Sequence, residues 1–151
     1  MMLAESAAGV KWTPPAGWVS SGATSMRAAT YTVAGAECVV YFFGQGQGGS
    51  VDANIQRWEG QFTQAGKPAP AKVGKKTVHG LNVTTVDTTG VYAGMAGPMM
   101  TQQAPKSDYR MIAAIVEAPG GNLFVKFTGP VTVIKANEAK FNAMVDSFQK
   151  Q

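Results

Sequence analysis

Four large apolar residues recur between positions 51 and 62 at spacings of four, three and four, which is the spacing of one face of an α-helix. They are Val51, Ile55, Trp58 and Phe62. Ser50 precedes them and is a residue type that commonly caps the first turn of a helix. Asp52 follows within that turn, near the positive end of the helix dipole. The sequence therefore predicts an amphipathic helix that begins after Ser50 and buries this stripe.

Much of the remaining chain alternates between runs of β-branched or aromatic residues and short turns, which is typical of β-hairpins. The expected strand pairs are Arg27–Val33 with Glu37–Phe43, Lys75–Val78 with Leu81–Tyr92, and Tyr109–Ala118 with Leu123–Thr128. Their connections contain glycine, which readily adopts the positive φ angles of tight turns. The stretch from Gly66 to Gly74 is predicted to be a loop.

A second helix is predicted near the C-terminal end, from about Thr132 or Asn137 to Phe148. Its buried side holds Phe141, Met144, Val145 and Phe148. Strands that pair through hairpins make a mostly antiparallel sheet. We therefore expect one α+β domain over residues 11–150, with a sheet of about six strands and two helices packed on it. Residues 1–10 are expected to be a disordered or artificially added segment, because they lack the features of an intact signal peptide.

Several short motifs resemble those of a group of exported bacterial proteins. They are the Trp-Pro motif around Trp12, Asn54-Ile55-Gln56-Arg57-Trp58, Glu117-Ala118-Pro119-Gly120-Gly121, and Phe127-Thr128-Gly129-Pro130 leading to Ser147-Phe148. Over residues 10–150 the order of elements is similar to the PsbP-like fold, named for a photosystem extrinsic subunit. The resemblance implies this fold, a periplasmic or secreted location, and a role as a binding or assembly module. It carries over no functional residue, because a shared fold is weak warrant for function.

The distribution of charge and apolar residues argues against two classes of protein. No apolar run approaches the roughly 20 residues that a membrane-spanning helix needs. The formal charge is +4, and basic residues cluster at Lys67, Lys72, Lys75 and Lys76. A nucleic-acid-binding surface would interleave aromatic residues with such cations, and this segment has none. We expect a solvated basic loop, no transmembrane segment and no nucleic-acid partner.

The segment Gly44-Gln45-Gly46-Gln47-Gly48-Gly49 matches G-x-G-x-x-G and lies between a predicted strand and a predicted helix. Such a loop lets backbone amides approach a pyrophosphate. A dinucleotide-binding fold also needs a parallel strand after the helix, ending in an acidic residue. Here a Pro- and Lys-rich segment without acids follows instead. We expect a flexible connection, with anion capture at the helix terminus and nucleotide binding as less favoured alternatives.

The sequence contains no recognisable catalytic constellation. His79 is the only histidine, and its His-Gly setting is typical of a surface turn. Cys38 lies in an apolar run and is expected to be a buried thiol. Among the acidic residues, Asp87 and Glu117 are the candidates for inward placement. We expect no enzymatic activity, no catalytic residue and no cofactor.

Residues 93–108 show neither the helical nor the strand periodicity of apolar residues, and they are rich in Gly, Pro and Met. This composition predicts a mobile flap. Met95, Met99 and Met100 carry thioethers that suit Cu(I), although no His or Cys is adjacent. We expect a non-catalytic extracytoplasmic binding or accessory domain for a protein or small ligand. Copper handling by this loop is the alternative, and an enzyme comes third. The expected recognition surface comprises Gly44, Gly46, Gly48, Gly49, Met99 and Met100.

Overall fold

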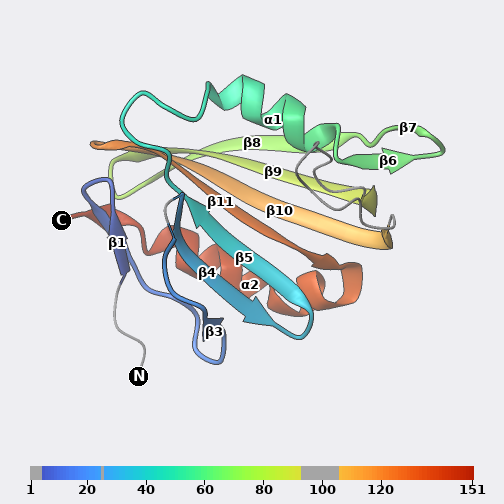
Figure 1. The fold of residues 1–151 in the computed structure, drawn as a ribbon, viewed down its shortest axis with the longest axis horizontal. Coiled ribbons are helices and arrows are strands. Elements are labelled where there is room, and N and C mark those ends of the chain that lie inside the picture. The colour runs from blue at the N-terminus through green and yellow to red at the C-terminus, as the bar shows by residue number, and fades with distance from the viewer. Residues whose placement is uncertain (1–4, 25, 93–105) are drawn as a thin grey trace.

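The computed structural model describes residues 5–24, 26–92 and 106–151. Their centre is a nine-stranded sheet of order β3-β4-β5-β11-β10-β9-β6-β7, with β8 also paired to β9 (Figure 1). All the pairings described in it are antiparallel. Its strands are β3 (Val19–Ser20), β4 (Arg27–Val33), β5 (Ala36–Tyr41), β6 (Phe62–Gln64), β7 (Lys67–Pro68), β8 (Ala71–Val78), β9 (Leu81–Tyr92), β10 (Lys106–Ala118) and β11 (Gly121–Pro130).

Two helices cover opposite faces of this sheet, α1 (Val51–Glu59) and α2 (Val131–Asp146), as Figure 1 shows. The two faces follow from the period of two along a strand. On β10, Ile112, Ala114 and Val116 join the cluster that includes α2. The residues between them, Met111, Ala113 and Ile115, join the cluster that includes α1. The sheet is therefore buried on both sides, which explains the long apolar run of β10.

A small sheet joins the two ends of the chain. It consists of β1 (Glu5–Ala7), β2 (Val10–Trp12) and β12 (Gln149–Lys150) in the order β1-β2-β12. Trp12 stacks on Phe148 with ring centroids 5.0 Å apart, and both side chains are buried. Residues 5–10 are therefore ordered, contrary to the expectation for residues 1–10. The sequence did not indicate this order because β2 pairs not only with the neighbouring β1 but also with β12, at the other end of the chain.

The α+β class and the antiparallel sheet are confirmed, but the expected six strands are too few. The extra strands of the large sheet are β3, β6 and β7, and the small sheet adds β1, β2 and β12; each is two or three residues long. Runs this short carry no recognisable alternation, so tertiary pairing alone defines them. None of the helices in the described part of the chain is long and apolar enough to cross a membrane.

The two ends of α1 differ in how well the sequence predicted them. The Ser50 side chain accepts a hydrogen bond from the Ala53 amide at 3.1 Å, as expected of an N-cap. The helix stops at Glu59, and the Gly60 amide closes its last turn by donating to the carbonyl of Gln56. Phe62 is fully buried in the same cluster, but it belongs to β6. The apolar stripe therefore continues past the helix into the next strand.

The segment predicted to be a loop, Gly66–Gly74, contains β7 and the first half of β8. Strand β8 pairs with β9 from Ala71 to Val78 and lies at an edge of the sheet. Its Lys72, Lys75 and Lys76 are exposed, as is Lys67 on β7. Lysines on an edge strand hinder further strand pairing. The basic cluster is therefore solvated, as predicted, but it lies on strands.

Candidate functional site

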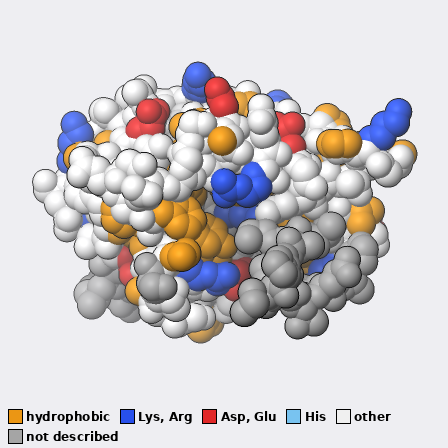
Figure 2. Space-filling view, turned by 45° about the horizontal axis from the view of Figure 1, so that its top comes forward, with side chains coloured by type: hydrophobic (Ala, Val, Ile, Leu, Met, Phe, Trp, Pro, Cys, Tyr) orange, Lys and Arg blue, Asp and Glu red, His pale blue; other side chains and the backbone are white. Residues whose placement is uncertain are grey.

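A hollow of about 470 Å³ lies on the face of the sheet that carries α1, and we call it the α1 groove. It is bounded by α1, by Gln61 just before β6, and by the strands β4, β5 and β11. Figure 2 brings the α1 side forward and shows hydrophobic side chains gathered beside Lys and Arg side chains. The apolar lining is Met26, Tyr41, Phe43, Trp58 and Phe124, the cations are Arg27, Arg57 and Lys126, and the uncharged polar residues are Thr24, Asn54 and Gln61.

Aromatic rings form the wall of the α1 groove. Tyr41 and Phe43 stack almost parallel, with centroids 5.8 Å apart and an interplanar angle of 10°. Phe43 contacts Phe124 at 5.8 Å, and Trp58 meets Phe124 edge to face at 6.4 Å and 87°. Trp58 and Phe124 are buried, whereas Tyr41 and Phe43 are half-buried and accessible from the groove. The wall therefore presents flat apolar surface to a bound molecule.

Lys126 is a charged residue in the middle of the apolar strand β11, and its side chain faces α1. Only 8% of its surface is exposed. Its Nζ donates to Gln61 Oε1 at 2.6 Å and lies 5.6 Å from the centre of the Tyr92 ring. Burial lowers the pKa of Lys126 to about 8, Glu37 opposes this shift, and the nearby Arg57 adds to it. At neutral pH a desolvated ammonium thus lies in the lining of the groove.

The two arginines of the groove differ in their surroundings. Arg27 forms an ion pair with Glu37 at 3.7 Å and lies over the Tyr41 ring at 5.6 Å. Arg57 projects from α1, is exposed, and donates to Asn54 Oδ1 at 3.3 Å. Within the described residues neither Arg57 nor Lys126 forms an ion pair with a carboxylate. The α1 groove therefore has an excess of positive charge.

The glycine-rich loop before α1 packs against the aromatic wall. Gly48 has a φ of +90°, and a Cβ there would lie 2.6 Å from Phe43 Cδ2 and 3.0 Å from Phe124 Cε2. Asn54 holds the loop by donating to the carbonyl oxygens of Gly48 at 2.8 Å and Ser50 at 2.9 Å. Glycine is thus needed here for close packing and for a positive φ. The strand after α1 pairs antiparallel with β9, so the parallel strand of a dinucleotide-binding fold is not formed.

The predicted recognition surface lies partly beside this site. Gly44 and Gly48 line a second hollow, which shares Met26 and Phe43 with the α1 groove. Gly46 and Gly49 are in the same loop and also have positive φ angles. Met95, Met99 and Met100 lie outside the described residues, as does most of the flap predicted at 93–108. The last three residues of that segment, 106–108, belong to β10. No group of His, Cys, Asp or Glu in the described ranges is arranged to hold a metal ion.

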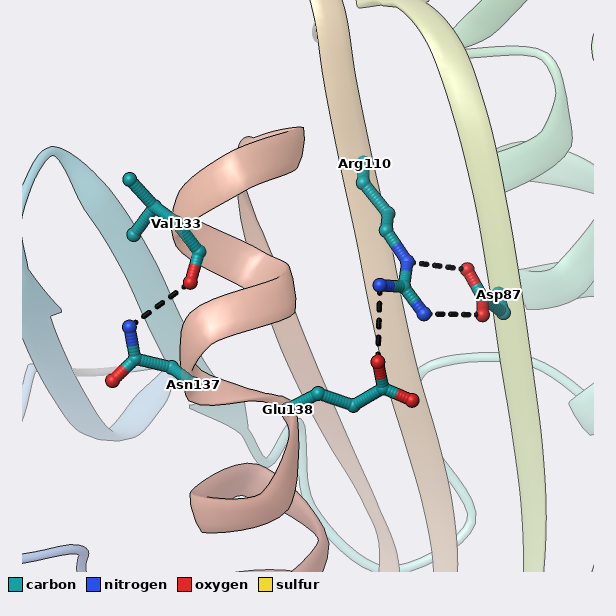
Figure 3. Close-up of polar contacts among 5 residues, drawn as sticks. All are labelled: Asp87, Arg110, Val133, Asn137 and Glu138. Carbon is teal, nitrogen blue, oxygen red and sulfur yellow. Dashed lines mark hydrogen bonds and ion pairs between the residues drawn. The ribbon is translucent and has the colours of Figure 1, made fainter.

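The candidate acid Asp87 is in an ion-pair network that joins the sheet to α2 (Figure 3). Arg110 on β10 donates to both Asp87 carboxylate oxygens, at 3.0 and 2.7 Å, and contacts Glu138 of α2 at 3.1 Å. The hydrogen bonds to Asp87 are the main cause that raises the pKa of Arg110. A hollow lined by Asp87 and Glu138 also contains Lys76, itself paired with Asp146 at 2.8 Å. Asp87, Arg110, Glu138, Lys76 and Asp146 are thus all in ion pairs, which is typical of a structural network.

The other residues considered from the sequence are not brought together. Glu117 is exposed, and His79 lies in the β8–β9 turn with Nδ1 2.9 Å from the carbonyl oxygen of Phe148. Cys38 is fully buried as predicted, and burial raises the pKa of its thiol. Such a thiol stays protonated and is unsuited to nucleophilic attack.

Comparison with known proteins gives a fold but no activity. The structure of cyanobacterial PsbP (CyanoP) from Synechocystis sp. PCC 6803 matches with a TM-score of 0.58 and 10% sequence identity, covering 95% of this chain and 88% of that one. The chain has a PsbP-like fold. No protein-family model matches the chain, and no curated protein matches it in sequence. The PsbP-like resemblance inferred from the sequence is thereby confirmed for the fold.

Sequence reasoning missed Lys126, Arg57 and Arg27 as residues of one site. Lys126 carried a usable signal, since it is a lone charge in the apolar run Leu123-Phe124-Val125-Lys126-Phe127. A buried charge without an evident partner is expensive and often marks a functional site. The two arginines carried no comparable signal, because isolated arginines are common on protein surfaces.

Proposed function

We propose that this chain is a non-catalytic binding or accessory domain that works outside the cytoplasm, and that the α1 groove receives its ligand. One observation carries this proposal: a groove walled by aromatic rings is also lined by the buried ammonium of Lys126. Ligand sites combine mostly apolar walls with a few placed polar groups, in volumes of about 300–1,000 Å³. The hollow of about 470 Å³ falls within that range.

Two further observations support binding over catalysis. Within the described residues, the hydrogen-bond partner of Lys126 is the uncharged Gln61 amide, so no second titratable group shares a proton with it. The carboxylate of Asp87, a candidate acid, is held by Arg110 in the network beneath α2. The extracytoplasmic location is supported by the resemblance to exported bacterial proteins described from the sequence.

The experiment fills the groove without disturbing the core. Thr24 lines the groove and is exposed, so Thr24→Trp should occupy it with an indole ring while the protein still folds. Thr132→Trp is the matched control, because Thr132 is exposed on α2, on the other face of the sheet. Each protein is incubated with a bacterial metabolite extract, and the retained small molecules are identified by mass spectrometry.

We expect the unmodified chain and Thr132→Trp to retain the same compound and Thr24→Trp to lose it. Retention of that compound by Thr24→Trp would place the ligand site elsewhere. Chemical conversion of the retained compound by the unmodified chain would overturn the non-catalytic part of the proposal.

A further inference from the structure

The cations of the α1 groove are poorly balanced by carboxylates. Arg27, Arg57 and Lys126 line it, whereas Glu37, the acidic residue paired with Arg27, is not among its lining residues and is half exposed. By contrast, the hollow beneath α2 contains Lys72 and Lys76 together with three carboxylates. Electrostatic complementarity therefore favours an anionic ligand in the α1 groove specifically.

The placement of Lys126 strengthens this inference. An ammonium has three N–H donors, and within the described residues the Lys126 Nζ uses one of them, toward Gln61. The positive charge of Arg57 acts on Lys126 and lowers its pKa. An anionic group between the two cations would relieve their repulsion and accept the donors still available. Hydrogen bonds between ions of opposite charge are the stronger kind.

The walls indicate the rest of the ligand. Next to these cations the groove is lined by the half-buried rings of Tyr41 and Phe43, and the buried rings of Trp58 and Phe124 complete the wall. Aromatic rings pack well against a flat apolar body in offset or edge-on contact. A molecule with a single charged end and a flat apolar body would match both parts of the lining.

We propose that the α1 groove binds a small organic anion with a flat apolar body, its anionic head group held by Lys126 and Arg57. This inference rests on the binding function proposed above and specifies its ligand class. Carboxylate, sulfonate and phosphate heads share the chemistry that these two residues recognise.

Two dyes distinguish the contribution of the anionic head group to affinity from that of the apolar body. Anilinonaphthalene sulfonate carries the anionic group, and N-phenylnaphthylamine has the same ring system without it. Both fluoresce when they leave water, so each can be titrated into the folded protein. We expect the sulfonate to bind about tenfold more tightly or better, because a charge-assisted contact to a desolvated ammonium is strong.

Variants of the two cations test where this preference arises. Lys126→Met should abolish it, and Arg57→Gln should reduce it while leaving the fold unaffected, since Arg57 is exposed. Lys75→Gln removes an exposed lysine of β8 outside the groove and should change neither affinity. Near-ultraviolet circular dichroism verifies that each variant retains native packing.

The outcomes are distinguishable from failure of the binding function itself. Equal affinity for the two dyes, lost in Thr24→Trp, would overturn the anionic ligand class and leave the binding groove intact. A sulfonate preference that survives in Lys126→Met and Arg57→Gln would also overturn the inference. Dye binding that is unchanged in Thr24→Trp would overturn the groove as the site, and with it both proposals.

Discussion

Replacing Lys126 with Met should make the protein more stable while removing a binding determinant. Methionine has a similar length and no charge, so Lys126→Met removes a buried ammonium without leaving a large cavity. Burial lowers the pKa of Lys126 from 10.5 to about 8. Each tenfold change in an equilibrium is worth about 1.4 kcal/mol, so at neutral pH the charge costs about 3 kcal/mol of folding free energy.

The loss of the partner for Gln61 offsets part of that gain. The Gln61 side chain is buried, and without Lys126 its Oε1 loses a hydrogen bond of 2.6 Å. An unsatisfied buried acceptor costs about 1–2 kcal/mol. We therefore expect Lys126→Met to raise the free energy of unfolding at pH 7 by about 1–2 kcal/mol. The double variant Lys126→Met/Gln61→Leu should gain about 3 kcal/mol, because both polar partners are replaced by apolar groups.

The pH dependence gives an independent check with a defined sign. The folded pKa of Lys126 is lowered, so between about 8 and 10.5 the unfolded chain binds more protons and wild-type stability rises relative to the variant. Arg27, Glu37, Arg57, Tyr41 and Tyr92 also surround this side chain. Burial raises the pKa of both tyrosines, which weakens folding at alkaline pH in each protein alike. The difference between wild type and variant therefore isolates Lys126.

Urea unfolding followed by tryptophan fluorescence at pH 7 and pH 9.5 measures this difference. We expect the advantage of Lys126→Met to shrink markedly at the higher pH. A variant less stable than wild type by about 1 kcal/mol or more at pH 7, or an advantage independent of pH, would refute the reasoning.

Three further predictions concern the structure that supports the groove and the helices. Arg110→Ala should destabilise the protein by about 2 kcal/mol in urea unfolding, less than a fully buried pair because Asp87 is about a third exposed; an unchanged midpoint would contradict the structural role of the network. Gly48→Ala should lower the midpoint clearly more than Gly46→Ala, because both have positive φ but only the former Cβ meets other atoms within 4 Å; equal effects would show that the loop does not pack on the rings. Trp58→Ala should cost about 3–5 kcal/mol, since the buried indole is a main contact of α1; a wild-type thermal midpoint would rule out that contact.

Local interactions explain what the sequence by itself determined. The N-cap at Ser50, the α1 stripe, and the turns of the hairpins depend on residues within a few positions of one another. Their capping residues and their apolar periodicity can therefore be recognised in short stretches of sequence. For the same reason the α+β class and the PsbP-like order of elements could be predicted from the sequence.

Tertiary structure alone decided which residues meet. The first half of β8, Ala71–Gly74, was missed because this edge strand has one neighbour and its residues show no alternation of buried and exposed positions. Lys126 and Gln61 are 65 positions apart, and Arg27 joins the α1 residues in the groove lining only when β4, β5 and β11 are paired. The groove depends on the register of those strands and on which face α1 covers. Because register assigns every side chain to a face, the charged groove exists only in the assembled sheet.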